Sequence, residues 1–169
     1  MPKPKPRTKL SPARGGPMQM TASSGYAIHG LAYLAYKGGD TVTYLSEIAE
    51  FFSIPSSYLA KVFQALARGG LVASYRGAKG GYALSRPGNE ITLRQVIEIF
   101  EGPIRNDCPL MRSPCNVRTL CSVSTRIGRA QQAFLDELDR HSIEEIGNDF
   151  IKMEEQGVQL DQVIRELRG

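Results

Sequence analysis

The three cysteines of this 169-residue chain lie in one short stretch, CPLMRSPCNVRTLC, as Cys108, Cys115 and Cys121. An odd number of thiols leaves one over if two form a disulfide. In a reducing compartment, clustered cysteines usually bind metal or carry out redox chemistry. Zinc sites usually keep one cysteine pair about two to four residues apart, so the wider gaps here argue mildly against zinc. Direct thiol sensing, by a disulfide between two of the three, stays open.

The composition excludes several classes of protein. No apolar run approaches the eighteen or so residues that a membrane helix needs, and the basic start MPKPKPRTKLSPARGGP lacks the apolar stretch of a secretory signal. A cytoplasmic protein with no membrane partner is therefore expected. The chain has two histidines, no glycine-rich phosphate loop and no paired-carboxylate motif, so we do not expect an enzyme.

Basic residues are concentrated toward the N-terminus. Residues 1–17 hold five Lys and Arg and no acid, residues 18–89 hold six against three acids, and residues 90–169 hold ten against fourteen. The first seventeen residues are rich in Pro and Lys and predict a disordered basic tail. Contact with phosphates, a solvated extension, or a true start at Met18 or Met20 are alternative interpretations of this tail.

Helical periodicity starts just after the tail. Residues 21–39 and 43–52 each place apolar residues on one face, with Thr43 expected to cap the second helix. A third helix follows Pro55, a residue suited to a first turn. Its apolar stripe and its polar opening predict the second helix of a helix-turn-helix unit; the stripe is Leu59, Val62, Phe63 and Leu66, and the polar residues are Ser56, Ser57, Tyr58 and Lys61.

A β-hairpin is expected next. The strand-like runs LVASY and YALS flank RGAKGG, whose glycines suit a turn with positive φ. Such a hairpin would be a wing, and Arg76 and Lys79 at its tip would reach phosphates or a narrow minor groove. The polar side chains of the preceding helix would then face base edges in the major groove. A surface hairpin whose charges only aid solubility is the alternative.

Two further helices follow. In ITLRQVIEIFEG, Thr92 and Gln95 have the spacing of a capping box. From about 117 to 140 a long amphipathic helix carries apolar residues three and four positions apart. This stripe would pack against the same stripe of a second copy, or in part within one subunit; it comprises Val123, Ile127, Ala130, Phe134 and Leu138.

At this point the chain resembles a known family. The stretches MQMTASSGYAIHGLAYLA and SIPSSYLAKVFQALARGGLVASYRGAKGGYALSR, with the three-cysteine segment, are similar to the bacterial winged helix-turn-helix regulators that include IscR, NsrR, RirA and CymR. The resemblance spans about residues 18 to 147. It implies that Ser57, Tyr58 and Lys61 lie on the recognition helix and that Arg76 is the minor-groove contact of the wing.

The resemblance also implies a cofactor. Thiolates are the usual ligands of iron-sulfur clusters, and similar family members place three cysteines at nearly this spacing. We therefore expect Cys108, Cys115 and Cys121 to hold a 2Fe-2S or 4Fe-4S cluster. Ser124 stands where IscR supplies a histidine, and Gly25 where some relatives supply an acid.

Two histidines are candidates for the fourth ligand. His29, one turn after Gly25, would reach the cluster from the partner subunit. A helix histidine without a special role is the competing interpretation. His141 is a weaker candidate, and a small exogenous ligand is a further alternative.

Together these predictions give a mainly α protein with a small β-hairpin wing, a winged helix-turn-helix plus a long dimerisation helix. It would be a homodimeric transcription regulator, a repressor that binds double-stranded promoter DNA. An iron-sulfur cluster that senses iron, nitric oxide or redox state would control its affinity for DNA. Structural zinc or thiol sensing without a cluster is the alternative. The expected division is a basic tail (1–17), a DNA-binding domain (18–102), a cysteine loop (103–122), a dimerisation helix region (117–147) and a C-terminal helix (148–169).

Overall fold

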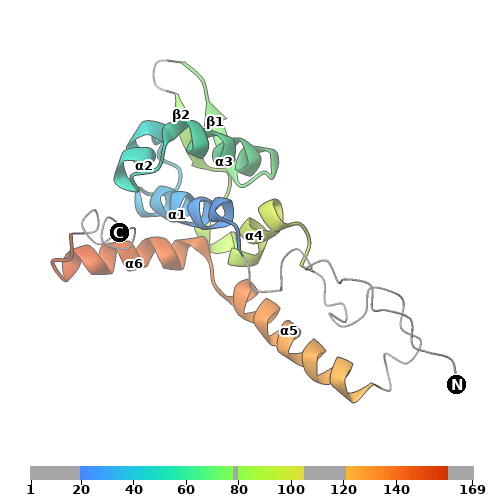
Figure 1. The fold of residues 1–169 in the computed structure, drawn as a ribbon. Helices are drawn as coiled ribbons and strands as arrows, with labels where there is room; N and C mark the ends of the chain where they lie inside the picture. Colours follow the sequence, from blue (N-terminus) through green and yellow to red (C-terminus); the bar gives the residue numbers. More distant parts are fainter. Residues whose placement is uncertain (1–19, 78–79, 105–120, 160–169) are drawn as a thin grey trace, which may run out of the picture.

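The computed structural model describes residues 20–77, 80–104 and 121–159. Most of its helices lie around a central helix, one long helix extends away from them, and a hairpin lies at one end (Figure 1). In these residues, the expected fold class of a mainly α protein with one small antiparallel hairpin is confirmed. The elements are α1 (Ala22–Tyr36), α2 (Leu45–Phe51), α3 (Ser56–Arg68), β1 (Val72–Tyr75), β2 (Gly81–Leu84), the 3-10 turn η1 (Gly88–Glu90), α4 (Leu93–Glu101), α5 (Ser122–Arg140) and α6 (Ile143–Glu155). Within the described ranges, no helix is long and apolar enough to cross a membrane.

Helix α1 is the centre of the core. It packs against α3, α4, α6 and strand β2, and Ala27, Leu31 and Leu34 have no exposed surface. Gly30 allows the ring of Phe63 on α3 to approach closely, because a Cβ at this position would lie 2.8 Å from that ring. Each fully buried large apolar side chain contributes about 1.5–3 kcal/mol, so α1 supports every element that surrounds it.

Helices α2 and α3 form the expected helix-turn-helix unit, joined by a tight turn in which Ser53 has a positive φ of 50°. The prediction that Thr43 caps α2 is wrong. The N-cap is Tyr44, without a side-chain hydrogen bond, and Thr43 is buried. Its backbone instead pairs with Tyr82 of β2 through two N–H···O bonds of 2.9 Å. Thr43 therefore extends the hairpin sheet rather than starting the helix.

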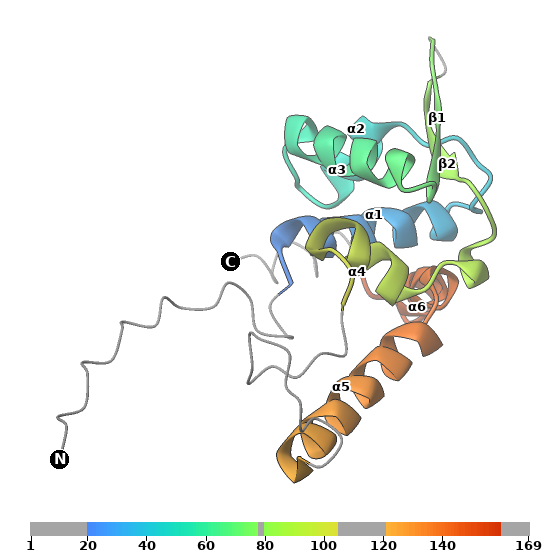
Figure 2. The same ribbon diagram turned by 90° about the vertical axis from the view of Figure 1, so that its right-hand side faces the viewer.

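The hairpin pairs β1 with β2 in antiparallel register, from Val72 opposite Leu84 to Tyr75 opposite Gly81. We call residues 72–84 the wing. Gly77, with φ of +103°, lies in the turn, as the glycine pattern predicted. The wing rises beside α3 in both ribbon views (Figures 1 and 2).

Helix α4 begins with the predicted capping box, in which Thr92 accepts from the Gln95 N–H and the Gln95 side chain accepts from the Thr92 N–H. Helix α5 contacts α4 at one end, and its other end points away from the remaining helices (Figure 2). Arg94 of α4 and Asp139 of α5 form an ion pair of 2.9 Å across this junction.

The observed helix bounds differ from those expected in the C-terminal half. The long helix begins at Ser122 rather than near residue 117, and the next helix begins at Ile143, before the expected boundary at 148. A second capping box, formed by Ser142 and Glu145, sets the start of α6 at Ile143 and was not predicted. The basic tail and residues 160–169 lie outside the described residues.

Replacing Gly147 by Ala should lower the free energy of unfolding by about 1–3 kcal/mol. Its Cβ would lie 2.9 Å from the Ala35 Cβ and 3.0 Å from the Ala32 carbonyl oxygen, so α6 would be pushed off α1. Urea unfolding measures the change. Gly25→Ala is the control, because its Cβ would meet nothing within 4 Å and Ala is favoured over Gly in a helix by about 0.5–1 kcal/mol. Equal effects of the two substitutions would contradict this packing.

Candidate nucleic-acid interface

Helix α3 has one buried face and one exposed face. The predicted stripe of Leu59, Val62, Phe63 and Leu66 is buried in the core. On the other side, Ser56, Ser57, Tyr58 and Lys61 are exposed. The structure thus brings four of the predicted DNA-binding residues together on the first two turns of one helix.

The exposed face of α3 continues beyond these residues. Gln64 and Arg68 are also exposed, and they follow Ser57 and Lys61 at intervals of three and four, which place residues on one side of a helix. The sequence reasoning missed both. The same spacing rule, applied to polar rather than apolar residues, would have found them.

Tyr58 is held by contacts with α1. Its hydroxyl and that of Ser23 share a hydrogen bond of 2.7 Å, and its ring meets the Tyr26 ring edge-on at 5.5 Å between centroids. The Tyr58 residue still exposes 38% of its surface. Two contacts from α1 therefore fix a side chain on the exposed face of α3.

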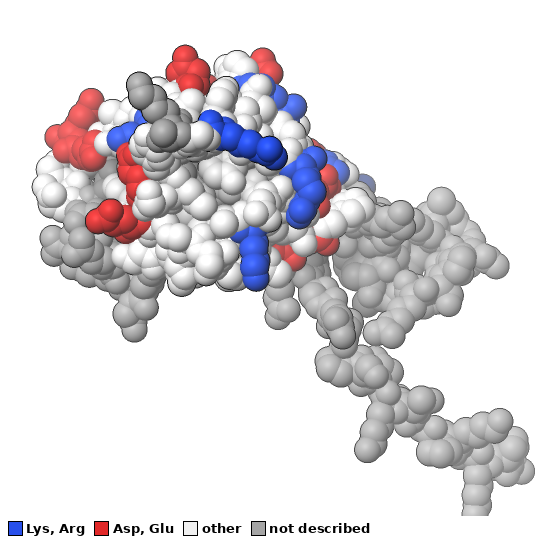
Figure 3. Space-filling view, turned by 90° about the horizontal axis from the view of Figure 1, so that it is seen from above, with Lys and Arg blue, Asp and Glu red and all other residues white. Residues whose placement is uncertain are grey.

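The wing places Arg76 on the surface directly after β1, next to the half-exposed Tyr75. Lys79 lies outside the described residues. A view onto the end of the molecule that carries α2, α3 and the wing shows Lys and Arg side chains among mostly uncharged residues, with acidic side chains mainly toward the edges (Figure 3). Lys and Arg neutralise nucleic-acid phosphates, so this face suits a polyanion.

Of the three predicted cysteine ligands, Cys121 lies in the described residues, whereas Cys108 and Cys115 lie outside them. Cys121 is a free, half-buried cysteine at the N-cap of α5, where its sulfur accepts the Ser124 N–H at 3.4 Å. The N-terminus of a helix favours negative charge. This position therefore suits a thiolate ligand.

His29 lies on α1 with its ring 5.5 Å from that of Phe52. It faces the helix-turn-helix unit, whereas the end of α5 that carries Cys121 points away from α1 and α2 in both ribbon views (Figures 1 and 2). One subunit therefore does not bring His29 and Cys121 together.

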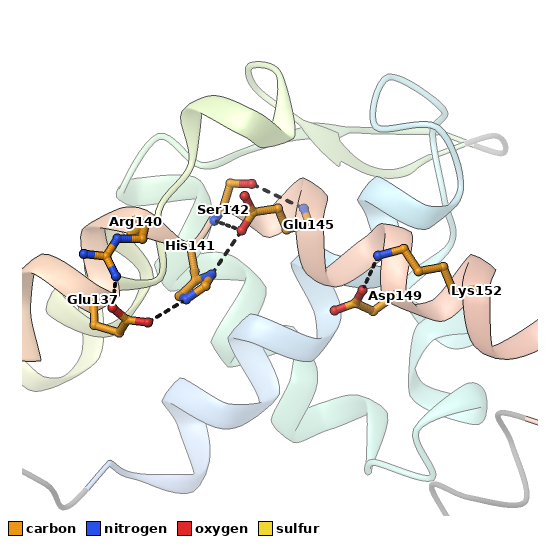
Figure 4. A network of polar contacts seen from close by, with 7 residues as sticks. All are labelled: Glu137, Arg140, His141, Ser142, Glu145, Asp149 and Lys152. Atoms are coloured by element: carbon orange, nitrogen blue, oxygen red, sulfur yellow. Dashed lines mark hydrogen bonds and ion pairs between the residues drawn. The ribbon is translucent and has the colours of Figure 1, made fainter.

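His141 lies at the corner between α5 and α6, in the network of polar contacts that Figure 4 shows. Its Nε2 is 3.0 Å from a Glu137 oxygen and its Nδ1 is 3.2 Å from a Glu145 oxygen. Glu137 also pairs with Arg140. Both ring nitrogens are thus engaged by carboxylates of the two helices, which is the arrangement of a charged clamp rather than of a metal ligand.

The helix-turn-helix unit followed by a basic wing defines a winged helix-turn-helix protein, a class that places its second helix in the major groove of DNA. A family model described as "Rrf2: Iron-dependent Transcriptional regulator" matches residues 20–149. The chain therefore belongs to the Rrf2 family, as its sequence motifs predicted. Members of this family are DNA-binding transcription regulators, typically dimeric, and are not enzymes.

Solved structures of family members have the same fold. CymR (YrzC), the global cysteine regulator of B. subtilis, is 28% identical, with 78% of this chain and 97% of that chain covered at a TM-score of 0.65. The oxidized form of Staphylococcus aureus CymR is 28% identical, with 77% and 96% covered at a TM-score of 0.59. T. potens IscR shares the fold at 23% identity, with 78% and 88% covered and a TM-score of 0.61.

The pKa of His141 should lie above the usual histidine value of about 6.5, because hydrogen bonds to Glu137 and then Glu145 favour the charged ring. Because the pKa is raised in the folded state, the clamp contributes its full stabilisation below about pH 6.5. This stabilisation is lost as the pH rises through the pKa of the folded state. An NMR titration of the His29→Gln variant, which leaves one imidazole, measures it. Glu137→Gln should lower this pKa; an unchanged titration would contradict the clamp.

Proposed function

We propose that this protein is a homodimeric regulator, a repressor, that binds double-stranded promoter DNA in the cytoplasm and whose DNA affinity an iron-sulfur cluster controls. The observation that carries the DNA part is the exposed polar face of α3 beside the basic wing. The cluster would sense iron, nitric oxide or redox state. The three cysteines and membership of a family described as iron-dependent support it.

Helix α3 is the proposed recognition helix. Ser56, Ser57, Tyr58 and Lys61 would present hydroxyls and an ammonium group to base edges and phosphates of the major groove. Arg76, at the start of the wing turn, would enter the adjacent minor groove, where a narrow groove attracts arginine. Lys79 would add a phosphate contact from the same turn.

Helix α5 is the proposed dimerisation element. Of its apolar stripe, Leu138 is buried within the subunit, while Val123 exposes 49% of its surface and Ala130 is exposed. Ile127 and Phe134 are only partly covered. A second copy of α5 would cover this stripe. The resulting two-fold arrangement suits half-sites about one helical turn, or roughly 34–36 Å, apart on the DNA.

Cys108, Cys115 and Cys121 are the proposed ligands of a 2Fe-2S or 4Fe-4S cluster. The position of Cys121 at the N-terminus of α5 supports this proposal, because a helix N-terminus favours the negative charge of a thiolate ligand. His29 of the partner subunit is the proposed fourth ligand, because His29 and Cys121 do not come together within one subunit (Figures 1 and 2). A bound cluster would act by favouring one arrangement of the two α5 helices, because a ligand shifts a conformational equilibrium by its differential affinity.

Thiol sensing is the second candidate function. Its support is the likeness to S. aureus CymR, which has been solved in an oxidized form. Three cysteines in fourteen residues provide the pair that a reversible disulfide needs. Structural zinc would fit the thiolates less well, because zinc sites usually keep a closer pair of cysteines.

Protein purified without oxygen should contain iron and absorb broadly in the visible, and Cys115→Ala should abolish this absorbance because it removes a ligand. An ultraviolet-visible spectrum with iron and zinc analysis measures both. Ser113→Ala, in the same stretch, is the matched control and should keep the colour. A colourless protein that contains zinc would indicate that the cysteines hold a structural zinc ion instead of a cluster. A metal-free protein that resists reconstitution would favour thiol chemistry.

Arg76→Ala should weaken DNA binding by about 1–3 kcal/mol if the side chain makes a specific groove contact. The measurement is a binding titration on a duplex obtained by in vitro selection with the wild-type protein, at several salt concentrations. Arg129→Ala, an exposed arginine on the side of α5 away from its apolar stripe, removes the same charge away from the proposed DNA interface and should have little effect. Equal losses of DNA affinity in the two variants would contradict a specific DNA contact of Arg76.

A further inference from the structure

We propose that Glu101 is a positioning residue for DNA recognition, which fixes Tyr58 of the recognition helix through the first turn of α1. Glu101, Thr21, Ser24, Ser23 and Tyr58 form what we call the relay. The inference rests on the proposed function, since it assigns a role in binding DNA to contacts that lie behind the DNA-facing surface.

One end of the relay joins α4 to α1. The Glu101 Oε1 atom accepts the Thr21 N–H at 2.8 Å, the Thr21 hydroxyl at 2.8 Å and the Ser24 hydroxyl at 2.5 Å. The hydrogen bond from Ser24, and then those from Thr21, lower the pKa of Glu101. The carboxyl group is therefore ionised throughout the neutral range, and hydrogen bonds to an ionised group are stronger than neutral ones.

Helix α1 needs this carboxylate. Its first turn contains no acidic residue, although negative charge is favoured at a helix N-terminus. Ser24 has no exposed surface, and a buried hydroxyl requires a hydrogen-bond partner. Glu101 provides both the charge and the partner from a different helix, so the start of α1 is placed by the end of α4.

The other end of the relay joins α1 to α3. Ser23, beside Ser24, shares the 2.7 Å hydrogen bond with the Tyr58 hydroxyl, and Tyr26 contacts the Tyr58 ring. Tyr58 therefore takes its side-chain position from the same turn of α1 that Glu101 holds. A change at the end of α4 reaches the proposed DNA-binding face within one helical turn.

The position of Glu101 in the chain gives this relay a regulatory meaning. It is the last residue of α4, and the three cysteines follow it in the sequence before α5 begins. Gly102, with φ of +80°, ends the helix directly after it. The relay therefore connects the point where α4 ends to a residue of the recognition helix, and it does so without involving α5.

The first measurement needs no DNA. Wild-type protein labelled with fluorotyrosine is compared by ¹⁹F NMR with the variants Glu101→Gln and Ser23→Ala, and Tyr58→Phe assigns the Tyr58 resonance. Both variants should move this resonance. The matched control is Glu98→Gln, which removes the same charge from α4; among the described residues it disturbs contacts with Arg94 and the Ile104 N–H instead. A Tyr58 resonance that stays in place in Glu101→Gln would overturn the relay.

The second measurement is affinity for the duplex selected with wild-type protein. Glu101→Gln and Ser23→Ala should each weaken binding roughly 2- to 10-fold, the effect of one hydrogen bond, and Glu98→Gln should not. In the Tyr58→Phe background, Glu101→Gln should cost little more, because both act on the same contact. Full additivity would overturn the relay.

Failure of the relay can be told apart from unfolding of a variant and from failure of the proposed function. Within the described residues, Ser23→Ala removes an exposed hydrogen bond, so it tests the relay even if Glu101→Gln unfolds. If the wild-type protein selects no duplex, the proposed function fails, while the ¹⁹F measurement still decides whether Glu101 positions Tyr58.

Discussion

The burial of α1 is the constraint on which the rest of the structure depends. Leu31 and Leu34 have no exposed surface, because α3, α4, α6 and β2 cover α1 on different sides. Apolar burial of this kind stabilises the fold but does not fix how the helices are oriented. The distances between helices are fixed by two close approaches, that of the Phe63 ring to Gly30 and that of Gly147 to the backbone of α1. The positions of α3 and α6 are consequently both set by their packing on α1.

Helix α5 differs from the other helices because it lies largely outside this core. Leu135 and Leu138 anchor its end near α4, and the Arg94–Asp139 ion pair adds a contact. Partly exposed ion pairs contribute only about 0–1 kcal/mol, so they orient the helix rather than stabilise it. The uncovered apolar stripe farther along α5 is the feature that a partner subunit would complete.

Two sets of polar contacts in the described residues lie where helices meet. The His141 clamp joins α5 to α6, and the relay joins α4 to α1 and α1 to α3. In the clamp and at the Glu101 end of the relay, a carboxylate meets donors from another segment, which gives a defined geometry that apolar packing alone does not. The proposed control by a cluster would need such defined contacts, because a ligand acts only through differences between discrete arrangements. The proposed relay would give α4 a direct path to Tyr58 of α3, separate from any change in α5.

The sequence by itself determined the elements, the family and most of the exposed and buried faces. The stripe from Leu59 to Leu66 and the capping box of Thr92 and Gln95 were predicted because helical periodicity and caps are local, spanning a few residues. Only the tertiary structure decided that Thr43 pairs with Tyr82 and that Glu101 holds Thr21, 80 residues away in the sequence. No local pattern encodes such partners: a threonine before a helix is equally suited to a cap or a strand, and a glutamate at a helix end is equally suited to solvent. What decides between these outcomes is which surfaces the packing of α1 brings together.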